Sequence, residues 1–202
     1  MARKRKPKME YRYYEIPAGS PVLALLGDKW VQNYGRDIDY LHFHNHLEVG
    51  FCYYGEGTVT FKEDIPFDGN MFTVIPKNFP HTTTSAGDSV SYWEWLFIDA
   101  DKFLREVYKD NPRMAQKVLD RVNRRAHFVR VQDKPQIGAL VQQIIGCMRE
   151  RKEFYLEEVK GLTLALLLQV ARWNREEAEK TEFEAGNTSL ITPAIDYISE
   201  CC

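Results

Sequence analysis

Three histidines at alternate positions, His42, His44 and His46, are followed two residues later by Glu48. Alternate side chains of an extended strand point to the same face, so these four would share one face. His81 follows the strand-like run NMFTVI and a turn, and a β-barrel would bring it opposite them. Imidazoles with a carboxylate are a common ligand set for Zn, Ni, Fe or Mn. The pattern predicts either a divalent-metal site at His42, His44, Glu48 and His81, or a polar cluster that hydrogen-bonds to water or a ligand.

The spacing of these residues follows two sequence motifs. Residues 42–55 have the order His-x-His, three residues, Glu, six residues, Gly, and residues 76–81 have the order Pro-x-Asn-x-x-His. The first order reproduces, and the second resembles, the two motifs of the cupin superfamily. That resemblance implies that the four metal-ligand positions of metal-containing cupins fall on His42, His44, Glu48 and His81. The chain departs from the second motif at Asn78, where the family usually has Gly, and at Ser85, where it usually has Asn.

Short runs rich in aromatic and β-branched residues fill the chain as far as residue 98. Turn signals separate them at Gly55–Gly57, Asp68–Gly69 and Ala86–Asp88. This rhythm is typical of a β-sandwich or barrel and differs from alternating helices and parallel strands. With the cupin resemblance, it predicts a β-barrel or jelly roll, a double-stranded β-helix, over residues 16–98.

Aromatic side chains of this region are candidates for the wall of a binding cavity. Trp93, Trp95 and Phe97 alternate along one strand and so share a face, and Tyr40 precedes the histidines. Aromatic walls suit a sugar or a planar ligand, but strand aromatics also pack commonly in the cores of small barrels. The predicted ligand contacts are His42, His44, Glu48, His81, Tyr40, Trp93 and Trp95.

Beyond Asp99 the hydrophobic period becomes helical. Asp99 or Asp101 would cap a first helix, and Pro112 and Pro135 would open a second and a third. A fourth, longest helix has a seam of residues at steps of three and four, which suits side-by-side packing of helices. The seam consists of Leu156, Val159, Thr163, Leu166, Val170 and Trp173. It predicts either a dimer interface or packing on the β-domain and the third helix, within an α-helical dimerisation region over residues 99–180.

The order of these elements resembles the sensor domain of AraC-family transcription regulators. The resemblance rests on the HxH-x-x-x-E strand, the hairpin at Gly55–Gly57, the IP-x-x-x-PH segment, the strand ending at Ile98 before helices, and the tail ITPAIDYISE, which resembles the opening helix of a helix-turn-helix domain. It implies a bacterial regulator whose barrel binds a small effector, with a sugar as one candidate. It also implies a homodimer that reaches DNA through a domain of which residues 181–202 hold the linker and first helix.

Composition limits the alternatives. The 27 Lys and Arg residues against 29 Asp and Glu residues give a net charge of −2, which argues against nucleic-acid binding by the whole surface. No apolar run reaches the length of a membrane span, and the start MARKRKPKMEYRYY lacks the apolar segment of a secretory signal. The four cysteines have no disulfide or zinc spacing. We therefore expect a cytoplasmic protein with reduced thiols and a basic, mobile arm over residues 1–15.

A second function class fits the same four ligands. In a metal-dependent cupin enzyme, an isomerase or a dioxygenase, a metal held by these side chains would act as Lewis acid or oxygen activator. No further acid or base is evident near the motif, and this function leaves the helical region and the tail unexplained. The sequence therefore favours a regulator without catalytic residues over an enzyme.

Overall fold

The computed structural model describes residues 8–35 and 40–177 of the chain. The predicted linker and DNA-binding helix over residues 181–202 lie outside the described residues, as do residues 1–7 of the predicted arm. Residues 8–12, in the second half of that arm, form a strand.

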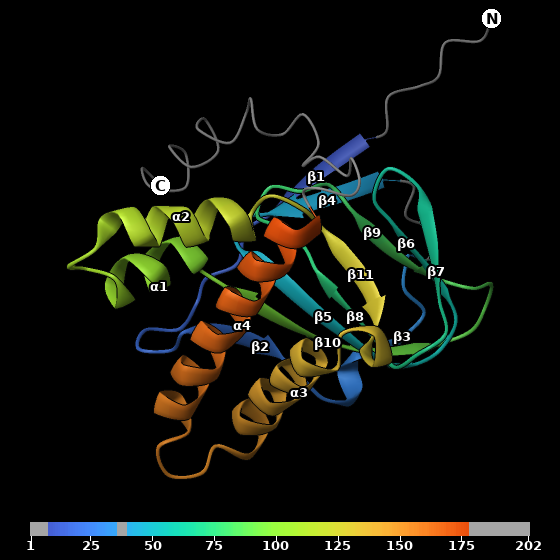
Figure 1. Cartoon of the computed structure of the whole chain (residues 1–202). Helices are drawn as coiled ribbons and strands as arrows, with labels where there is room; N and C mark the ends of the chain where they lie inside the picture. The colour runs from blue at the N-terminus through green and yellow to red at the C-terminus, as the bar shows by residue number, and fades with distance from the viewer. Residues whose placement is uncertain (1–7, 36–39, 178–202) are drawn as a thin grey trace, which may run out of the picture.

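A six-stranded sheet forms the centre of the molecule (Figure 1). Its strands pair antiparallel throughout. In spatial order they are β11 (His127–Arg130), β8 (Met71–Val74), β5 (Leu47–Tyr54), β10 (Ser91–Ile98) and β2 (Val22–Leu25), with β3 (Val31–Gln32) also paired to β10. A 3-10 turn, η1 (Asp28–Trp30), joins β2 to β3.

Two smaller sheets complete the β-domain. One has the order β7 (Asp64–Phe67), β6 (Gly57–Thr60) and β9 (Thr82–Ser85), and the other pairs β1 (Lys8–Arg12) with β4 (Tyr40–His44) in parallel. The prediction of a β-rich domain followed by helices is confirmed. Within the described residues, however, the ladders do not join into one closed barrel.

The helices begin where the sequence predicts. Asp99 caps α1 (Ala100–Val107) by accepting a hydrogen bond from the backbone N–H of Lys102. Pro112 occupies the first turn of α2 (Pro112–Val122), which Asn111 caps, and Pro135 occupies the first turn of α3 (Pro135–Glu150). The long helix α4 (Tyr155–Glu177) follows. One segment differs from the helical prediction, because residues 127–130 form β11 and extend the central sheet, before the turn η2 (Val131–Asp133).

The helices and the central sheet share one hydrophobic core. Figure 1 shows α3 and α4 across one face of the six-stranded sheet, with β6 and β7 away from the helices. Buried residues of the sheet, such as Val49 and Leu96, belong to the same cluster as Leu104, Ile144 and Leu166 of the helices. A second aromatic cluster lies within the β-domain, around Trp93 and Phe67.

The predicted seam of α4 is part of this intramolecular core. Val159, Thr163, Leu166, Val170 and Trp173 are all buried, and Leu156 is half-buried. They are covered because α4 packs against α2 and α3 of the same chain. The dimer-interface interpretation of these residues is therefore wrong, and the alternative, packing inside the chain, is what the structure has.

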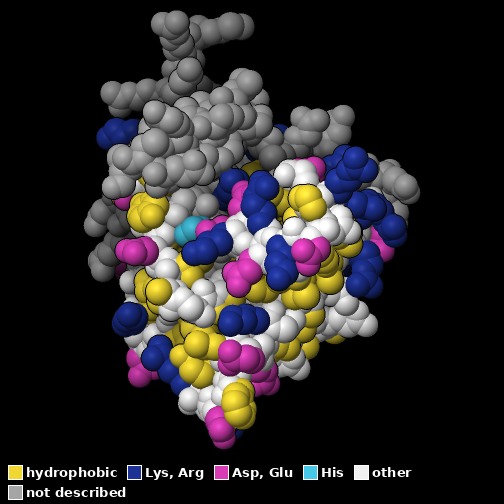
Figure 2. Space-filling view, turned by 90° about the vertical axis from the view of Figure 1, so that its left-hand side faces the viewer, with side chains coloured by type: hydrophobic (Ala, Val, Ile, Leu, Met, Phe, Trp, Pro, Cys, Tyr) yellow, Lys and Arg dark blue, Asp and Glu magenta, His cyan; other side chains and the backbone are white. Residues whose placement is uncertain are grey.

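Figure 2 shows the face at the left of Figure 1. Basic and acidic side chains are mixed among hydrophobic ones over most of it, as the balanced composition predicts, and several basic side chains lie together at its upper right edge. In the described part of the chain, no helix is both long enough and apolar enough to cross a membrane.

Candidate functional site

Backbone hydrogen bonds bring the two predicted motifs together. His42 and His81 exchange N–H to carbonyl bonds of 2.9 Å each, which joins β4 to the residue that precedes β9. Glu48, in β5, exchanges bonds of 2.9 and 2.8 Å with Ile75. Side chains that are far apart in the sequence therefore meet because their own backbones are paired.

The departure from the cupin pattern at Asn78 leaves the connecting turn intact. Asn78 has a φ of 60°, in the left-handed region, and its N–H donates to the carbonyl oxygen of His44 over 2.8 Å. Glycine takes this conformation most easily, and asparagine is among the residues that tolerate it best. The second departure, Ser85, accepts a hydrogen bond from the N–H of Tyr34.

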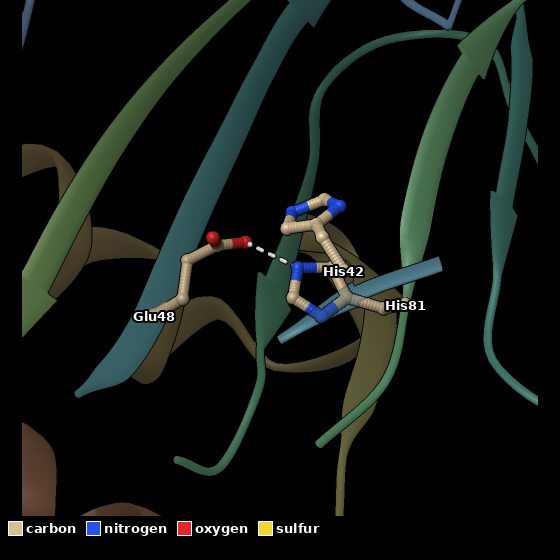
Figure 3. Close-up of side chains that lie close together, drawn as sticks. All are labelled: His42, Glu48 and His81. Carbon is tan, nitrogen blue, oxygen red and sulfur yellow. Dashed lines mark ion pairs between the residues drawn. The ribbon is translucent and has the colours of Figure 1, made fainter. Parts of the chain in front are cut away.

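The carboxylate of Glu48 lies between two imidazoles. Its Oε2 is 3.0 Å from Nε2 of His44, and its Oε1 is 3.4 Å from Nε2 of His81. Figure 3 shows Glu48 and His81 pointing toward each other, with the ring of His42 beside them; the ring centroids of His42 and His81 are 4.3 Å apart. One donor atom each from His42, Glu48 and His81 lie within 4.8 Å of one another. The structure thus gathers three of the four predicted ligands, while His44 contacts the far oxygen of Glu48.

The second nitrogen of each buried imidazole is already engaged. Nδ1 of His44 lies 2.8 Å from the carbonyl oxygen of His46, and Nδ1 of His81 lies 2.9 Å from that of Phe79. A carbonyl oxygen accepts, so each Nδ1 carries the hydrogen. The Nε2 of a neutral ring is then a lone pair, and both Nε2 atoms and Oε1 of Glu48 are buried without a hydrogen-bond partner. Lone pairs that face a carboxylate require a proton or a cation between them.

Burial and neighbouring charges shift the pKa values of this cluster. Burial alone would raise the pKa of Glu48, but the charges of His81 and His44 outweigh it and lower that pKa below its usual range. Burial, with the neighbouring His81, lowers the pKa of His42 to about 2. Glu48 is therefore ionised and His42 neutral at pH 7, and both are the protonation states in which these groups bind metals.

A cavity of about 260 Å³ opens beside the cluster. This volume is near the lower end of the range for small-molecule sites, about 300–1,000 Å³. Its wall combines the ligand-type residues with aromatic, hydroxyl, amide and guanidinium groups. The lining residues include His42, Glu48, His81, Trp95, Phe97, Trp30, Tyr34, Tyr14, Arg12, Asn33, Thr82 and Thr83.

The remaining predicted contacts lie elsewhere. Trp93 is fully buried against Phe67 and stacks on Trp95, with ring centroids 4.9 Å apart, so it supports the wall without lining it. Tyr40 starts β4 opposite Lys8 and does not line the cavity. His46, the third histidine of the run, lies 2.9 Å from the carbonyl oxygen of Tyr14.

The lining residues that the sequence reasoning missed include Arg12, Tyr14, Trp30 and Tyr34. Arg12 and Tyr14 come from the segment expected to be a mobile arm. Tyr14 is fixed by a ring stack of 3.9 Å on Phe97 and by a bond from its N–H to Oδ1 of Asn45. These contacts join the segment after β1 to β10 and to the turn after β4, and no spacing in the sequence marks them.

Comparison with known proteins finds similarity in solved structures. No family model matches the chain, and no curated protein matches it. ToxT from Vibrio cholerae O395 is 12% identical with a TM-score of 0.45, over 84% of this chain and 57% of ToxT. An apo variant of ToxT from Vibrio cholerae strain SCE256 is 13% identical with a TM-score of 0.47, over 80% of this chain and 59% of that one.

The AraC-like transcriptional activator CuxR is 14% identical with a TM-score of 0.39, over 65% of this chain and 42% of CuxR. These matched proteins are AraC-like regulators. This chain spans about half the length of the structures it matches. One of the ToxT structures contains a bound unsaturated fatty acid.

Proposed function

We propose that this chain is the effector-sensing and dimerising portion of an AraC-type transcription regulator. The observation that carries the proposal is the meeting of His42 and Glu48 from one motif with His81 from the other, on the wall of an aromatic-lined cavity. The helices packed on the sheet that forms this wall occupy the place expected of a transmitting region. The β-domain would then be a variant of the cupin jelly roll, and its ligand a small molecule such as a sugar.

Strand β10 connects the cavity to the helices. Trp95 and Phe97 on one of its faces line the cavity, while Glu94 on the other face forms an ion pair with Arg149 near the end of α3. A ligand that binds two conformations of the wall with different affinity would shift their populations, and this strand would carry the shift to α3. A domain attached beyond the helices would bind DNA, and its position would change with that of α3.

A homodimer remains part of this proposal, with a contact other than the seam predicted from the sequence. The seam residues are buried by packing inside the chain, so two copies would meet through a different face. AraC-type regulators act on paired half-sites, whose spacing mirrors the two-fold symmetry of a dimer.

A divalent transition metal, Zn, Ni, Fe or Mn, is a further part of the proposal. His42, Glu48 and His81 would hold it, and the buried, unpaired Nε2 of His81 and Oε1 of Glu48 are the donor atoms that fit it. When bound, such an ion supplies a Lewis acid that polarises a ligand oxygen. The same donor set supports the second candidate function, a metal-dependent cupin isomerase or dioxygenase.

Ligand binding tests the cavity. We expect at least one member of a panel of sugars, aromatic acids and divalent metals to raise the melting temperature of the chain by about 5–10 °C at a hundred times its Kd. Thr82 lines the cavity and is half-buried, so Thr82→Phe would fill the space and abolish the rise. A circular dichroism spectrum would establish that this variant folds.

Regulation is tested by fusing the chain to a DNA-binding domain that needs a dimer. The stabilising compound should change reporter expression from the fusion, and should leave expression from the Thr82→Phe fusion unchanged. A compound that binds the chain, is chemically converted by it and leaves the reporter unaffected would favour the enzyme and overturn the regulator.

A further inference from the structure

Arg12 places a guanidinium at the wall of the cavity. It is the last residue of β1 and is paired in register with His44 of β4, so the parallel ladder fixes its position beside the histidine cluster. Its side chain is about one-third exposed, and one nitrogen, Nη2, lies 3.3 Å from Oε2 of Glu10. Both partners are partly exposed, so this ion pair is weak and exchangeable.

Besides Glu10, the titratable groups near Arg12 include Tyr14, whose side chain is hydrogen-bonded to it, and Glu48. The carboxylate of Glu48 faces the imidazoles of His44 and His81. Among the described lining residues, Arg12 therefore contributes the positive charge that borders open space. A planar guanidinium offers paired N–H groups that match the two oxygens of a carboxylate.

A second hydrogen-bond donor lines the same cavity. Nε1 of Trp30 is buried and has no hydrogen-bond partner. A buried N–H without an acceptor costs free energy, and an acceptor-rich ligand in the cavity would satisfy it. The rings of Trp95, Phe97 and Tyr34 supply flat apolar surface around the two donors.

We propose that the ligand of this cavity is a small planar carboxylate of the benzoate class, and that Arg12 selects it. The carboxylate would pair with the guanidinium of Arg12, and the ring would lie against the aromatic wall, with Nε1 of Trp30 donating to a ligand oxygen. A neutral sugar offers no charge for Arg12. The inference rests on the proposed function, because it names the ligand class of the cavity proposed as the effector site.

Calorimetric titration with matched acids and amides tests it. Benzoate and salicylate should bind the chain at least about tenfold more tightly than benzamide and salicylamide. Arg12→Gln should weaken binding of the acids by about ten- to a hundredfold and leave the amides unchanged. Arg12→Lys should retain part of the preference, because it keeps the charge and loses the paired geometry. Arg130→Gln removes an exposed arginine that is paired with Asp68. This control should change neither the binding of the acids nor that of the amides.

The outcomes separate this inference from the proposed function. If arabinose or glucose binds, Thr82→Phe abolishes that binding and Arg12→Gln does not affect it, the cavity is an effector site and the carboxylate inference is wrong. If neither acid binds more tightly than its amide, the inference is likewise overturned. If the acids bind Thr82→Phe and the unmodified chain equally, they bind outside the cavity, and the carboxylate inference alone is overturned.

Discussion

Glu48 shows how a single residue acquires a role from its neighbours. A buried carboxylate is costly unless its charge is matched, and here both of its oxygens face imidazole nitrogens. The backbone carbonyls of His46 and Phe79 fix the hydrogens of these rings on Nδ1. The Nε2 atoms therefore face the carboxylate, so a proton or a metal ion must lie between them, and hydrogen-bonded imidazoles of this kind are typical of metal ligands.

Metal uptake is the property that follows at the residue scale. Protein purified without chelator and then exposed to Zn²⁺ or Ni²⁺ should bind close to one equivalent, measured by elemental analysis after desalting. Glu48→Gln keeps the shape of the side chain and removes its charge, and should lower the affinity by at least about 100-fold. Glu56→Gln, an exposed carboxylate in the β5–β6 turn, is the control. Equal metal contents in all three proteins, or none in any, would exclude the site.

Strand β10 is the element that connects the β-domain to the helices. Its buried Glu94 accepts hydrogen bonds from the hydroxyls of Tyr53 and Tyr92, at 2.7 and 2.8 Å, from the N–H of Gly27 at 2.8 Å, and from Arg149. Gly27 directly precedes η1, which carries Trp30 into the cavity wall. One carboxylate thus holds the strand, the η1 turn and the end of α3 together.

The stability of this element should depend on pH. Burial raises the pKa of Glu94, but the hydrogen bonds from Arg149 and its other donors outweigh burial and lower that pKa below its ordinary value of 4.5. A lowered pKa means that the ionised form stabilises the fold above about pH 4.5, and that this contribution is lost as the pH falls. At pH 7, Glu94→Gln should lower the free energy of unfolding by about 1–3 kcal/mol.

Urea unfolding at pH 7 and at decreasing pH measures this difference. The gap between Glu94→Gln and the unmodified chain should narrow as the pH approaches 3. Glu157→Gln removes an exposed carboxylate 3.8 Å from Lys160 and should have little effect at any pH. A gap that stayed constant with pH would show that the charge of Glu94 is not what stabilises the contact.

At the scale of the whole molecule, the β-domain and the helices are not separate folding units. The sequence divides them near residue 99, but one buried cluster contains Phe51 and Ile98 of the sheet together with Val141 and Leu166 of the helices. Each part therefore covers apolar surface of the other. A substitution at a buried position of α4 should therefore destabilise both the β-domain and the helices.

Leu166→Ala tests this shared core. Leu166 is fully buried, so the substitution should lower the free energy of unfolding by about 2–5 kcal/mol. Helical circular dichroism and tryptophan fluorescence should report the same shifted midpoint, because three of the four tryptophans, Trp30, Trp93 and Trp95, lie in the β-domain. Leu168→Ala, at a half-buried position, should cost less. A shift confined to the helical signal would mean that the two parts unfold independently.

Interactions between residues close in the sequence made part of this structure predictable. The helix starts at Asp99, Pro112 and Pro135 follow from capping and from the fixed φ of proline, which act within a few residues. The grouping of His42, Glu48 and His81 follows from motif spacing, because that spacing encodes the register of paired strands.

Tertiary contacts decided the rest. Trp93 and Trp95 alternate on one face, and only packing against Phe67 makes Trp93 core while Trp95 reaches the cavity. The seam of α4 suits another helix of any origin, and the proximity of α2 and α3 decides that it packs within the chain. Arg12 enters the cavity wall through a parallel pairing across 32 residues, between Arg12 and His44. Such long-range pairing depends on the whole fold, whereas caps, turns and strand periodicity depend on neighbouring residues alone.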